Sequence, residues 1–268
     1  MMNRFLTAAC AATMVFAAGC GSSGGPNYRL FAADGSYGSS GFLYAIDPDA
    51  GEIKVVGGLA DSSGDTLYSL TGLVFGSDGV LYGSTSDDAP VQDNVFVSID
   101  TQTAEVTEID IESDDDECFD AVGDLEIVDG TIYGVSDDGA GDTGCFLTVT
   151  TDGTVEMVTD GFGWAGGLAY DAAADALYHL TEGGSTLDTV DLESGELDEG
   201  IDVDDPVDDY DGMAYSYVKA MAMVDGRLLA IMGTYYDNSV LVEIDTDSGN
   251  VTVLTPVPDS MDALAAIR

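Results

Sequence analysis

Short runs in which apolar and polar residues alternate follow one another from about residue 27 to the end of the chain. Val, Ile, Thr and Tyr fill these runs, and Asp-Gly, Ser-Gly and Gly-Gly pairs separate them, as expected of strands joined by tight turns. Apolar residues at the helical spacing i, i+3, i+4 are nearly absent. The pattern therefore predicts an all-β fold.

One hairpin motif is written five times along the chain. The first copy is FLYAIDPDAGEIKVV at 42–56, and the others lie at 94–109, 145–158, 185–201 and 239–254. The Asp that ends the first strand can accept hydrogen bonds from the turn backbone, and the Gly can adopt the positive φ that a tight turn needs. We interpret the repeated Asp as a turn residue without an activity of its own.

A further pair of strands precedes each hairpin, so the repeating unit has four strands and a period of about 45–50 residues. A repeat of this kind is typical of a β-propeller. Four complete units span 69–110, 119–158, 163–201 and 211–254.

The two ends of the chain complement each other. The segment 27–33 already corresponds to the second strand of a unit, and 261–268 is a spare strand similar to the first strand at 71–76. Pairing these segments would close a ring and remove its exposed edges. The sequence thus predicts a five-bladed β-propeller over 27–268, closed by pairing of its N-terminal and C-terminal strands, with a composite blade made of 27–58 and 261–268. An open β-sandwich is the alternative.

The first twenty residues have the pattern of an export signal. Arg4 precedes an apolar run that ends at Ala18, which has the length of a signal-peptide core and is too short to span a bilayer. The run ends in AAGC, which resembles the lipobox of bacterial lipoproteins, although Ala17 stands where that family prefers Leu.

The lipoprotein resemblance implies a signal peptide at 1–19, a lipidated Cys20 and a flexible tether over 20–26. It also implies an exported protein of the cell envelope whose membrane attachment is the lipid alone. Gly21 replaces the Asp that marks inner-membrane retention in enteric bacteria, which favours the outer membrane in a Gram-negative cell. An ordinary cleaved signal peptide with a free Cys20 is the alternative.

The hairpin text LYAIDPDAGEIKVV also resembles the repeats of quinoprotein-like and YVTN-type bacterial propellers. That resemblance covers most of the exported chain and implies the fold. Quinoprotein dehydrogenases close each repeat with Trp, whereas Val and Thr occupy those positions here and Trp164 is the one Trp of the chain. A bound quinone is therefore not expected.

Charge restricts the class of partner. The chain has 51 Asp and Glu against six Lys and Arg, and its formal net charge is −45. Nucleic acids and anionic lipid surfaces are recognised through basic patches, so this composition argues against both. We expect a monomer whose partner is a protein or a glycan bound at the acidic loops, with Ca²⁺ as a candidate cofactor.

Two cysteines remain in the exported domain, Cys118 and Cys145. An even pair in an oxidising compartment predicts a disulfide bond. Both positions fall at the same end of the third predicted blade, which is consistent with that pairing.

Acidic residues concentrate in the two longest loops that join predicted blades. Carboxylates at this density suit Ca²⁺, which takes six to eight oxygen ligands. Neither loop fits an EF-hand, and a solvated acidic loop is the alternative. The candidate ligands are Asp114, Asp115, Asp116, Asp204, Asp205, Asp208, Asp209 and Asp211.

Residues for catalysis are few. The one His, His179, lies on a predicted strand, where packing explains it better than general-base chemistry, and no nucleophile-elbow, zinc or phosphate-loop motif is present. A glycoside hydrolase or lyase could use carboxylates in the central channel. The weak candidates, at the starts of predicted innermost strands, are Asp124, Lys219 and Asp262, with Thr71 nearby.

Taken together, these patterns favour a lipid-anchored binding or interaction module over an enzyme. Trp164 and the neighbouring Tyr235 and Tyr236 could stack on a sugar ring, but packing explains them equally well. The alternatives are a carbohydrate-active hydrolase or lyase that uses channel carboxylates, and a structural envelope protein without a small ligand.

Overall fold

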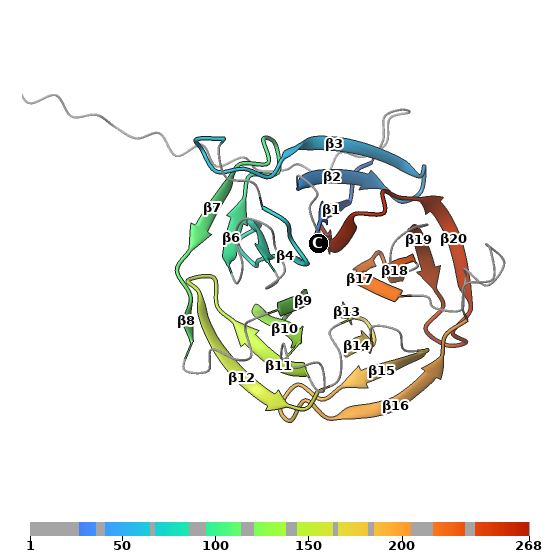
Figure 1. The fold of residues 1–268 in the computed structure, drawn as a ribbon. Coiled ribbons are helices and arrows are strands. Elements are labelled where there is room, and N and C mark those ends of the chain that lie inside the picture. Colours follow the sequence, from blue (N-terminus) through green and yellow to red (C-terminus); the bar gives the residue numbers. More distant parts are fainter. Residues whose placement is uncertain are drawn as a thin grey trace, which may run out of the picture.

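The computed structural model describes residues 27–35, 41–64, 68–85, 95–113, 121–137, 144–162, 166–181, 185–204, 217–233 and 239–267. Within these ranges the regular elements are strands, and they form five sheets arranged around a central axis (Figure 1). The described ranges contain no helix with the length and apolar character needed to cross a bilayer.

The closing blade has the order β21-β1-β2-β3 and joins the two ends of the chain. Its strands are β21 (Met261–Ala266), β1 (Leu30–Asp34), β2 (Phe42–Asp47) and β3 (Glu52–Gly58). Blade 2 consists of β4 (Gly72–Phe75), β5 (Leu81–Ser84), β6 (Phe96–Ile99) and β7 (Val106–Ile109).

Blade 3 has a fifth strand that the repeat did not predict. Its four regular strands are β9 (Ala121–Val128), β10 (Thr131–Asp137), β11 (Gly144–Val149) and β12 (Thr154–Asp160). The short β8 (Glu112–Ser113) comes from the connection after blade 2 and pairs in parallel with the outer edge of β12.

Blades 4 and 5 return to four strands each. Blade 4 consists of β13 (Gly167–Asp171), β14 (Ala176–Leu180), β15 (Thr186–Val190) and β16 (Leu197–Asp202). Blade 5 consists of β17 (Tyr217–Val224), β18 (Arg227–Gly233), β19 (Val240–Ile244) and β20 (Val251–Pro256).

Ring closure occurs where the sequence predicts it. β21 pairs antiparallel with β1, so that Ala32 lies opposite Leu264. The Ile267 N–H extends this ladder by donating to the Arg29 carbonyl at 2.9 Å. The prediction of a five-bladed propeller with one composite blade is confirmed.

All five blades pair their second and third strands in one register. Leu30 lies opposite Ile46 in the closing blade, and Leu81 lies opposite Ile99 in blade 2. The corresponding pairs in blades 3, 4 and 5 are Ile132 with Val149, Leu177 with Val190, and Leu228 with Ile244. The repeat read from the sequence is therefore a repeat of backbone pairing.

The hairpin Asp acts as a turn residue, as predicted. Asp191 Oδ1 accepts N–H bonds from Glu193 at 3.1 Å and Ser194 at 2.8 Å, and these bonds together with the Ser194 hydroxyl lower the pKa of Asp191. Gly195 then adopts φ of 69°. Equivalent bonds are made by Asp47, Asp100 and Asp245.

Glycine in this turn also allows neighbouring blades to approach. A Cβ on Gly249, whose φ is 73°, would lie 1.8 Å from the Asp202 carbonyl oxygen of the preceding blade. Gly226 has a similar φ of 76°, but a Cβ there would meet nothing within 4 Å. Gly249 is thus required by space as well as by backbone conformation.

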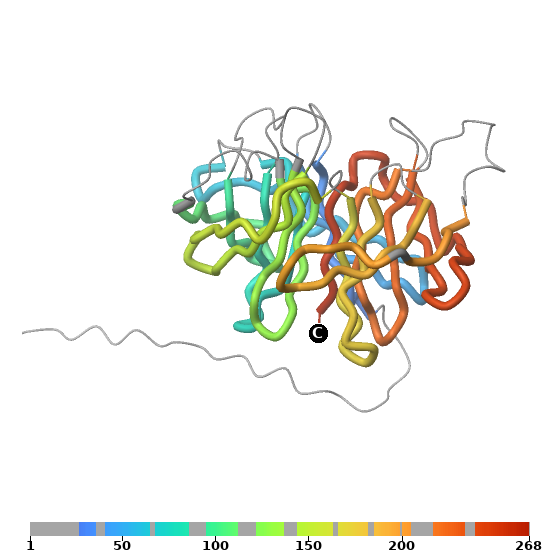
Figure 2. Tube along the Cα trace, turned by 90° about the horizontal axis from the view of Figure 1, so that it is seen from below, coloured from blue at the N-terminus to red at the C-terminus, as the bar shows by residue number. Residues whose placement is uncertain are grey.

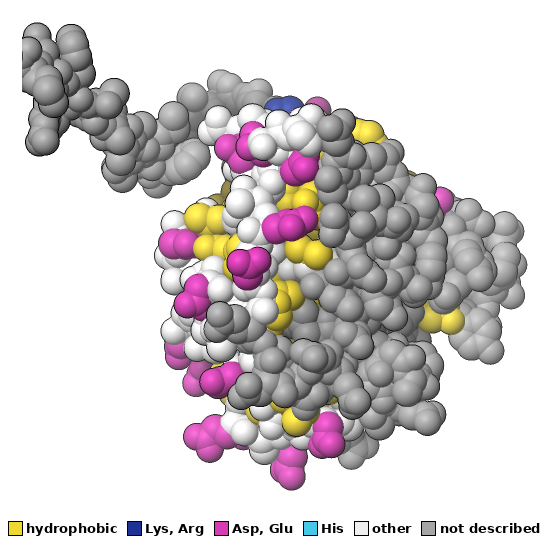
Figure 3. Space-filling view, turned by 60° about the vertical axis from the view of Figure 1, so that its left-hand side comes forward, with side chains coloured by type: hydrophobic (Ala, Val, Ile, Leu, Met, Phe, Trp, Pro, Cys, Tyr) yellow, Lys and Arg dark blue, Asp and Glu magenta, His cyan; other side chains and the backbone are white. Residues whose placement is uncertain are grey.

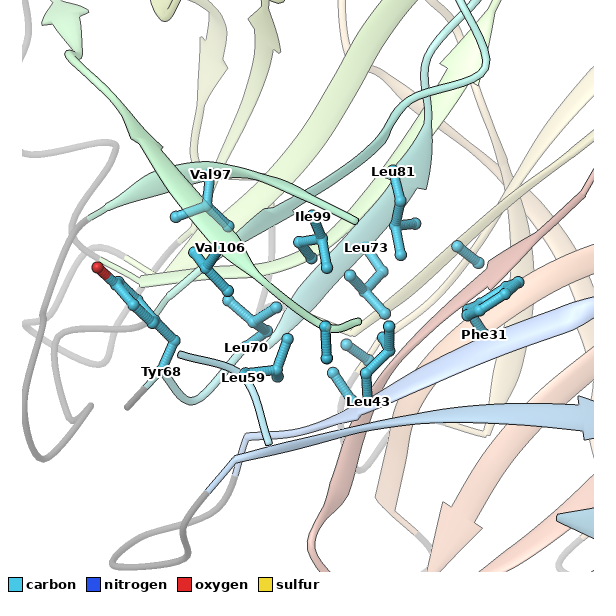
Figure 4. Close-up of a cluster of buried hydrophobic side chains, with 14 of the residues drawn as sticks. Phe31, Leu43, Leu59, Tyr68, Leu70, Leu73, Leu81, Val97, Ile99 and Val106 are labelled. Carbon is cyan, nitrogen blue, oxygen red and sulfur yellow. The ribbon is translucent and has the colours of Figure 1, made fainter. Parts of the chain in front are cut away.

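The hydrophobic core is divided among the seams between blades. One cluster packs β1 and β2 of the closing blade against blade 2 and includes Phe31, Leu43, Leu73 and Val97, as Figure 4 shows. Four further clusters occupy the other four seams. Each blade is therefore stabilised by both of its neighbours, and no blade has a core of its own.

The ring has two distinct faces. On the upper face the innermost strands begin and the second strands end, for example where Gly72 pairs with Ser84 and Tyr217 pairs with Gly233. On the lower face lie the hairpin turns, Asn27 and Ile267, and the C-terminus is marked there in Figure 2. Blade-to-blade connections and second-to-third strand connections therefore leave the described strands on the upper face.

Candidate functional site

Two carboxylates of β9 occupy the centre of the ring. Asp124 and Glu126 are two residues apart on one strand, so their side chains lie on the same side of it. By register, the positions matching Asp124 in the other innermost strands hold Gly72, Gly167, Ala220 and Ala263. Those matching Glu126 hold Val74, Ala169, Ala222 and Ala265. Blade 3 thus supplies carboxylates to an axis otherwise lined by small or apolar side chains.

Asp124 connects three blades through backbone hydrogen bonds. Its Oδ2 accepts the Leu168 N–H of β13 at 2.9 Å and the Met221 N–H of β17 at 3.1 Å. Its Oδ1 accepts the Leu125 N–H at 2.9 Å. The side chain therefore satisfies N–H groups on the unpaired inner edges of blades 4 and 5, which would otherwise be buried without partners.

The pKa of Asp124 lies well above its usual range because the residue is completely buried. Transfer of a carboxylate out of water disfavours the charged form. The three N–H donors and the nearby Glu126 modify this shift, the donors by lowering the pKa and Glu126 by raising it.

Glu126, two residues further along β9, accepts backbone N–H groups in a similar way. Its Oε2 accepts the Tyr170 N–H of β13 at 3.1 Å, and its Oε1 accepts the Ile127 N–H at 2.6 Å. Both carboxylates are buried, and the inner strands enclose a cavity of about 10 Å³ beside Glu126 and Met221. That volume holds about one water molecule and no larger ligand.

Lys219 and Asp262 form an ion pair across the seam that closes the ring. Lys219 Nζ lies 2.8 Å from Asp262 Oδ1 and donates to the Asp259 carbonyl at 2.7 Å. Both residues are the extra residue of a β-bulge, in β17 and β21 respectively. A bulge re-aims the side chain it carries, and here it brings opposite charges of neighbouring blades together.

The three predicted catalytic candidates therefore have different surroundings. Lys219 and Asp262 lie together, with side chains only 12% and 17% exposed. Asp124 is directed to backbone N–H groups, and Thr71 donates its hydroxyl to the Val122 carbonyl at 2.5 Å. All of these contacts join one blade to another, so the geometry gives each residue a role in assembling the ring.

Glu126 was not among the residues predicted from the sequence. The signal was present in GDLEIV (123–128), where two acids alternate with apolar residues on an innermost strand. In a strand buried on both faces, a second carboxylate needs a buried partner, and the edge of the neighbouring blade provides it.

His179 is enclosed within blade 4 and its neighbours. Its Nδ1 lies 3.2 Å from the Gly167 carbonyl oxygen, and its ring centroid lies 4.8 Å from that of Phe162. Burial lowers the pKa of His179 to about 4, so the imidazole is neutral at physiological pH. A completely buried ring cannot reach a substrate without rearrangement of the blade.

Another buried carboxylate, Asp34, lies at the upper end of β1. Asp34 accepts hydroxyl hydrogen bonds from Ser260 at 2.7 Å and Tyr44 at 3.1 Å, and the Phe42 N–H at 3.1 Å. Burial raises the pKa of Asp34 in spite of these donors. This network ties β21, β1 and β2 together beside the closing seam.

Of the candidate calcium ligands, the structure describes Asp204. It is exposed, and its N–H donates to the Gly249 carbonyl at 3.0 Å. Across the described residues, no group of three or more His, Cys, Asp or Glu side chains could hold a metal ion. The other candidates, Asp114, Asp115, Asp116, Asp205, Asp208, Asp209 and Asp211, lie outside the described residues, as do Trp164, Tyr235 and Tyr236.

Cys145 is buried at the start of β11 and is disulfide-bonded. Its predicted partner Cys118 lies outside the described residues, as does the predicted lipid-anchor residue Cys20. Pairing of Cys118 with Cys145 stays a prediction.

Charged side chains are unevenly distributed. Asp and Glu are scattered over the rim near β7 and β12, with hydrophobic side chains between them (Figure 3). On the lower face, Arg29 contacts Asp49 and Asp225, and Arg227 contacts Asp49 at 2.8 Å and Glu243 at 2.7 Å. Both arginines therefore lie at the seam between blade 5 and the closing blade, as the Lys219 ion pair does.

The described fold defines the chain as a five-bladed β-propeller. No protein-family profile matches the sequence, and no curated protein is similar to it. A crystal structure at 1.35 Å of a protein of unknown function from Bacteroides caccae is similar with a TM-score of 0.53 and 14% identity, over 90% of this chain and 100% of that one. In all, 411 chains of solved structures are similar, and at such identity the likeness shows the fold alone.

Proposed function

We propose that the protein is an exported, lipid-anchored β-propeller that acts as a binding or interaction module, with its partner contacting the upper face. The observation that carries this proposal is the closed channel. Asp124 and Glu126 are buried against backbone N–H groups of the neighbouring blades, and the cavity that the inner strands enclose beside Glu126 has a volume of only about 10 Å³. Because a cavity of this size cannot hold a ligand, we expect a partner to contact the loops that leave the upper face.

The sequence supports an acidic upper face. The connections 114–120 and 205–216 join strands of successive blades, and they carry seven of the eight candidate calcium ligands. A protein or glycan with a basic or cation-bridged surface fits this charge. Lipidation at Cys20 stays a proposal that rests on the AAGC motif.

Site-specific photocrosslinking in intact cells tests the binding role. A photoreactive residue at the exposed Ser185, which directly precedes β15 on the upper face, should yield adducts of defined mass. The same residue at the exposed Thr131, on the lower face, is the control. Adducts from Thr131 alone, or from neither position together with no binding to a glycan array, would contradict the proposal. Loss of acyl labelling in Cys20→Ser tests the anchor separately.

The calcium hypothesis has its own test. If Ca²⁺ orders the two acidic connections, millimolar CaCl₂ should raise the Tm relative to chelator at fixed high ionic strength, where nonspecific screening is constant. An unchanged Tm would count against calcium without affecting the binding role.

A further inference from the structure

The five outer seams share one construction. After each outermost strand, an apolar residue turns into the seam toward the next blade. Phe162 donates its N–H to the Gly144 carbonyl at 2.8 Å, as Leu59 does to Gly41 at 2.8 Å and Val203 to Ser185 at 2.6 Å. Ile111 and Val257 hold the equivalent sequence positions after β7 and β20.

In three seams the next residue of the chain pairs with the outer edge of the following blade. Ala60 forms a parallel bridge with Glu105 and accepts the Val106 N–H at 2.8 Å. Glu112 pairs in the same way with Thr154 of β12. The Asp204 N–H donates to the Gly249 carbonyl at 3.0 Å on the edge of blade 5. The first two contacts are parallel β pairings, and the Asp204 hydrogen bond lies at the same position of its blade edge.

Between blades 3 and 4, the described residues show no such contact with the outer edge of β16. Leu197 lies opposite Val190, in the register in which Val106 lies opposite Ile99, so its N–H is directed to the outer edge of β16. Among the described residues, that N–H has no partner there. The Leu197 side chain is 37% exposed, whereas its counterpart Val106 is 3% exposed.

A groove lies along this outer edge of β16, at the level where three other blade edges receive such a contact. It has a volume of about 270 Å³ and is lined by the end of β12 and the turn before β16, including Thr159, Phe162, Glu196 and Leu197. In Figure 1 the end of β12 lies beside the turn that leads into β16. The groove therefore offers an unpaired strand edge, an exposed apolar side chain and a carboxylate.

We propose that this groove binds an extended segment of another protein, which adds as a parallel strand to the edge of β16. Addition of a strand to an exposed edge is a common mode of peptide recognition. By the register of the chain's own connections, one residue of the segment donates its N–H to the Gly195 carbonyl and accepts the Leu197 N–H.

The same register sets the chemistry of the bound segment. Paired residues of neighbouring strands share a face, so the side chain of the bridging residue lies beside Glu196 and those of its two neighbours lie on the Leu197 side. A Lys or Arg flanked by apolar residues fits these positions. The net charge of −45 favours a basic segment further.

Titration of the ¹⁵N-labelled protein with the peptide Ac-Thr-Val-Lys-Val-Thr-NH₂ tests the site. We expect shifts of the amides of Leu197 and Gly195. Methylation of the Lys amide should weaken binding about five-fold, because one hydrogen bond is lost, and methylation of the following Val amide should not, because that N–H points away from β16. Replacing Lys by Asp should abolish the shifts.

Leu197→Pro removes the edge N–H and should weaken binding to the same extent as methylation of the Lys amide. Val253→Pro makes the same change on the edge of β20 and is the control, and a thermal melt checks that both variants fold. Equal effects of the two methylated peptides, shifts confined to another face, or equal binding of the Asp peptide would overturn the proposal. Self-association that Leu197→Pro abolishes would assign the groove to a second copy and would overturn it as well.

Discussion

Replacing Asp124 with Ala should destabilise the protein more than replacing an exposed carboxylate with Ala, although both substitutions remove one negative charge. The substitution leaves the N–H groups of Leu168 and Met221 buried without an acceptor, because both donate to Asp124 within 3.1 Å. An unsatisfied buried donor costs about 1–3 kcal/mol, so the free energy of unfolding should fall by about 2–6 kcal/mol. That is a large share of the stability of a domain of this kind, about 5–15 kcal/mol.

The pH dependence follows from burial. Because burial raises the folded-state pKa of Asp124 above the ordinary value of 3.8, its contribution to stability is complete below that value and is lost as pH rises through the folded pKa. Asp124→Asn cannot titrate. The wild type should therefore gain stability relative to Asp124→Asn as pH falls from 8 toward 4.

Urea denaturation followed by circular dichroism measures both effects. High constant ionic strength screens the net charge, and Asp198→Ala, an exposed carboxylate of β16, controls for loss of one charge. A loss in Asp124→Ala no larger than in Asp198→Ala would refute the connection between blades. A wild-type advantage over Asp124→Asn that grows with rising pH would refute the raised pKa.

Three further predictions concern other parts of the ring. Burial lowers the pKa of His179 from 6.5 to about 4, so its contribution of about 3 kcal/mol should be present above pH 6.5 and be lost as pH falls through 4; His179→Gln should flatten that part of a urea-denaturation series, and an unchanged slope would disprove it. Gly249→Ala should lower the Tm well beyond Gly226→Ala, since both strain a positive φ but only the first creates a clash; equal losses would contradict the close approach. Arg227→Met should cost up to about 1 kcal/mol in low salt and less at 1 M NaCl, and a loss that salt does not reduce would exclude the ion pair with Glu243 as its cause.

The architecture could be predicted because the features that define the repeat are local in the sequence. Strand alternation, the Asp and Gly of each turn, and the complementary chain ends are all properties of short segments. The register follows from them, since a slip by one residue would turn Leu81 or Ile99 away from the seam. The pairing of β1 with β21 required one long-range inference. It was possible because the first repeat lacks its innermost strand and the end of the chain has a spare strand.

The roles of the channel residues could not be predicted in this way. From the sequence alone, an acidic residue on an innermost strand is compatible with catalysis, because the groups that it contacts are not known. Asp124 contacts the N–H groups of Leu168 and Met221, which lie 44 and 97 residues away in the sequence. The bulges that pair Lys219 with Asp262 depend on strand geometry that the alternation pattern does not encode. The fifth strand of blade 3 was missed because β8 spans two residues.

The central claim is that the C-terminal strand closes the ring by pairing with the N-terminal one. In the ladder that includes the Ile267 to Arg29 hydrogen bond, Ala32 and Leu264 form a non-hydrogen-bonded pair, whose Cα atoms lie about 4.5 Å apart. The direct measurement is the nuclear Overhauser effect between their Hα protons. We expect a strong cross-peak between Ala32 and Leu264; its absence, or a cross-peak from Leu264 to a residue outside β1, would contradict the closed ring.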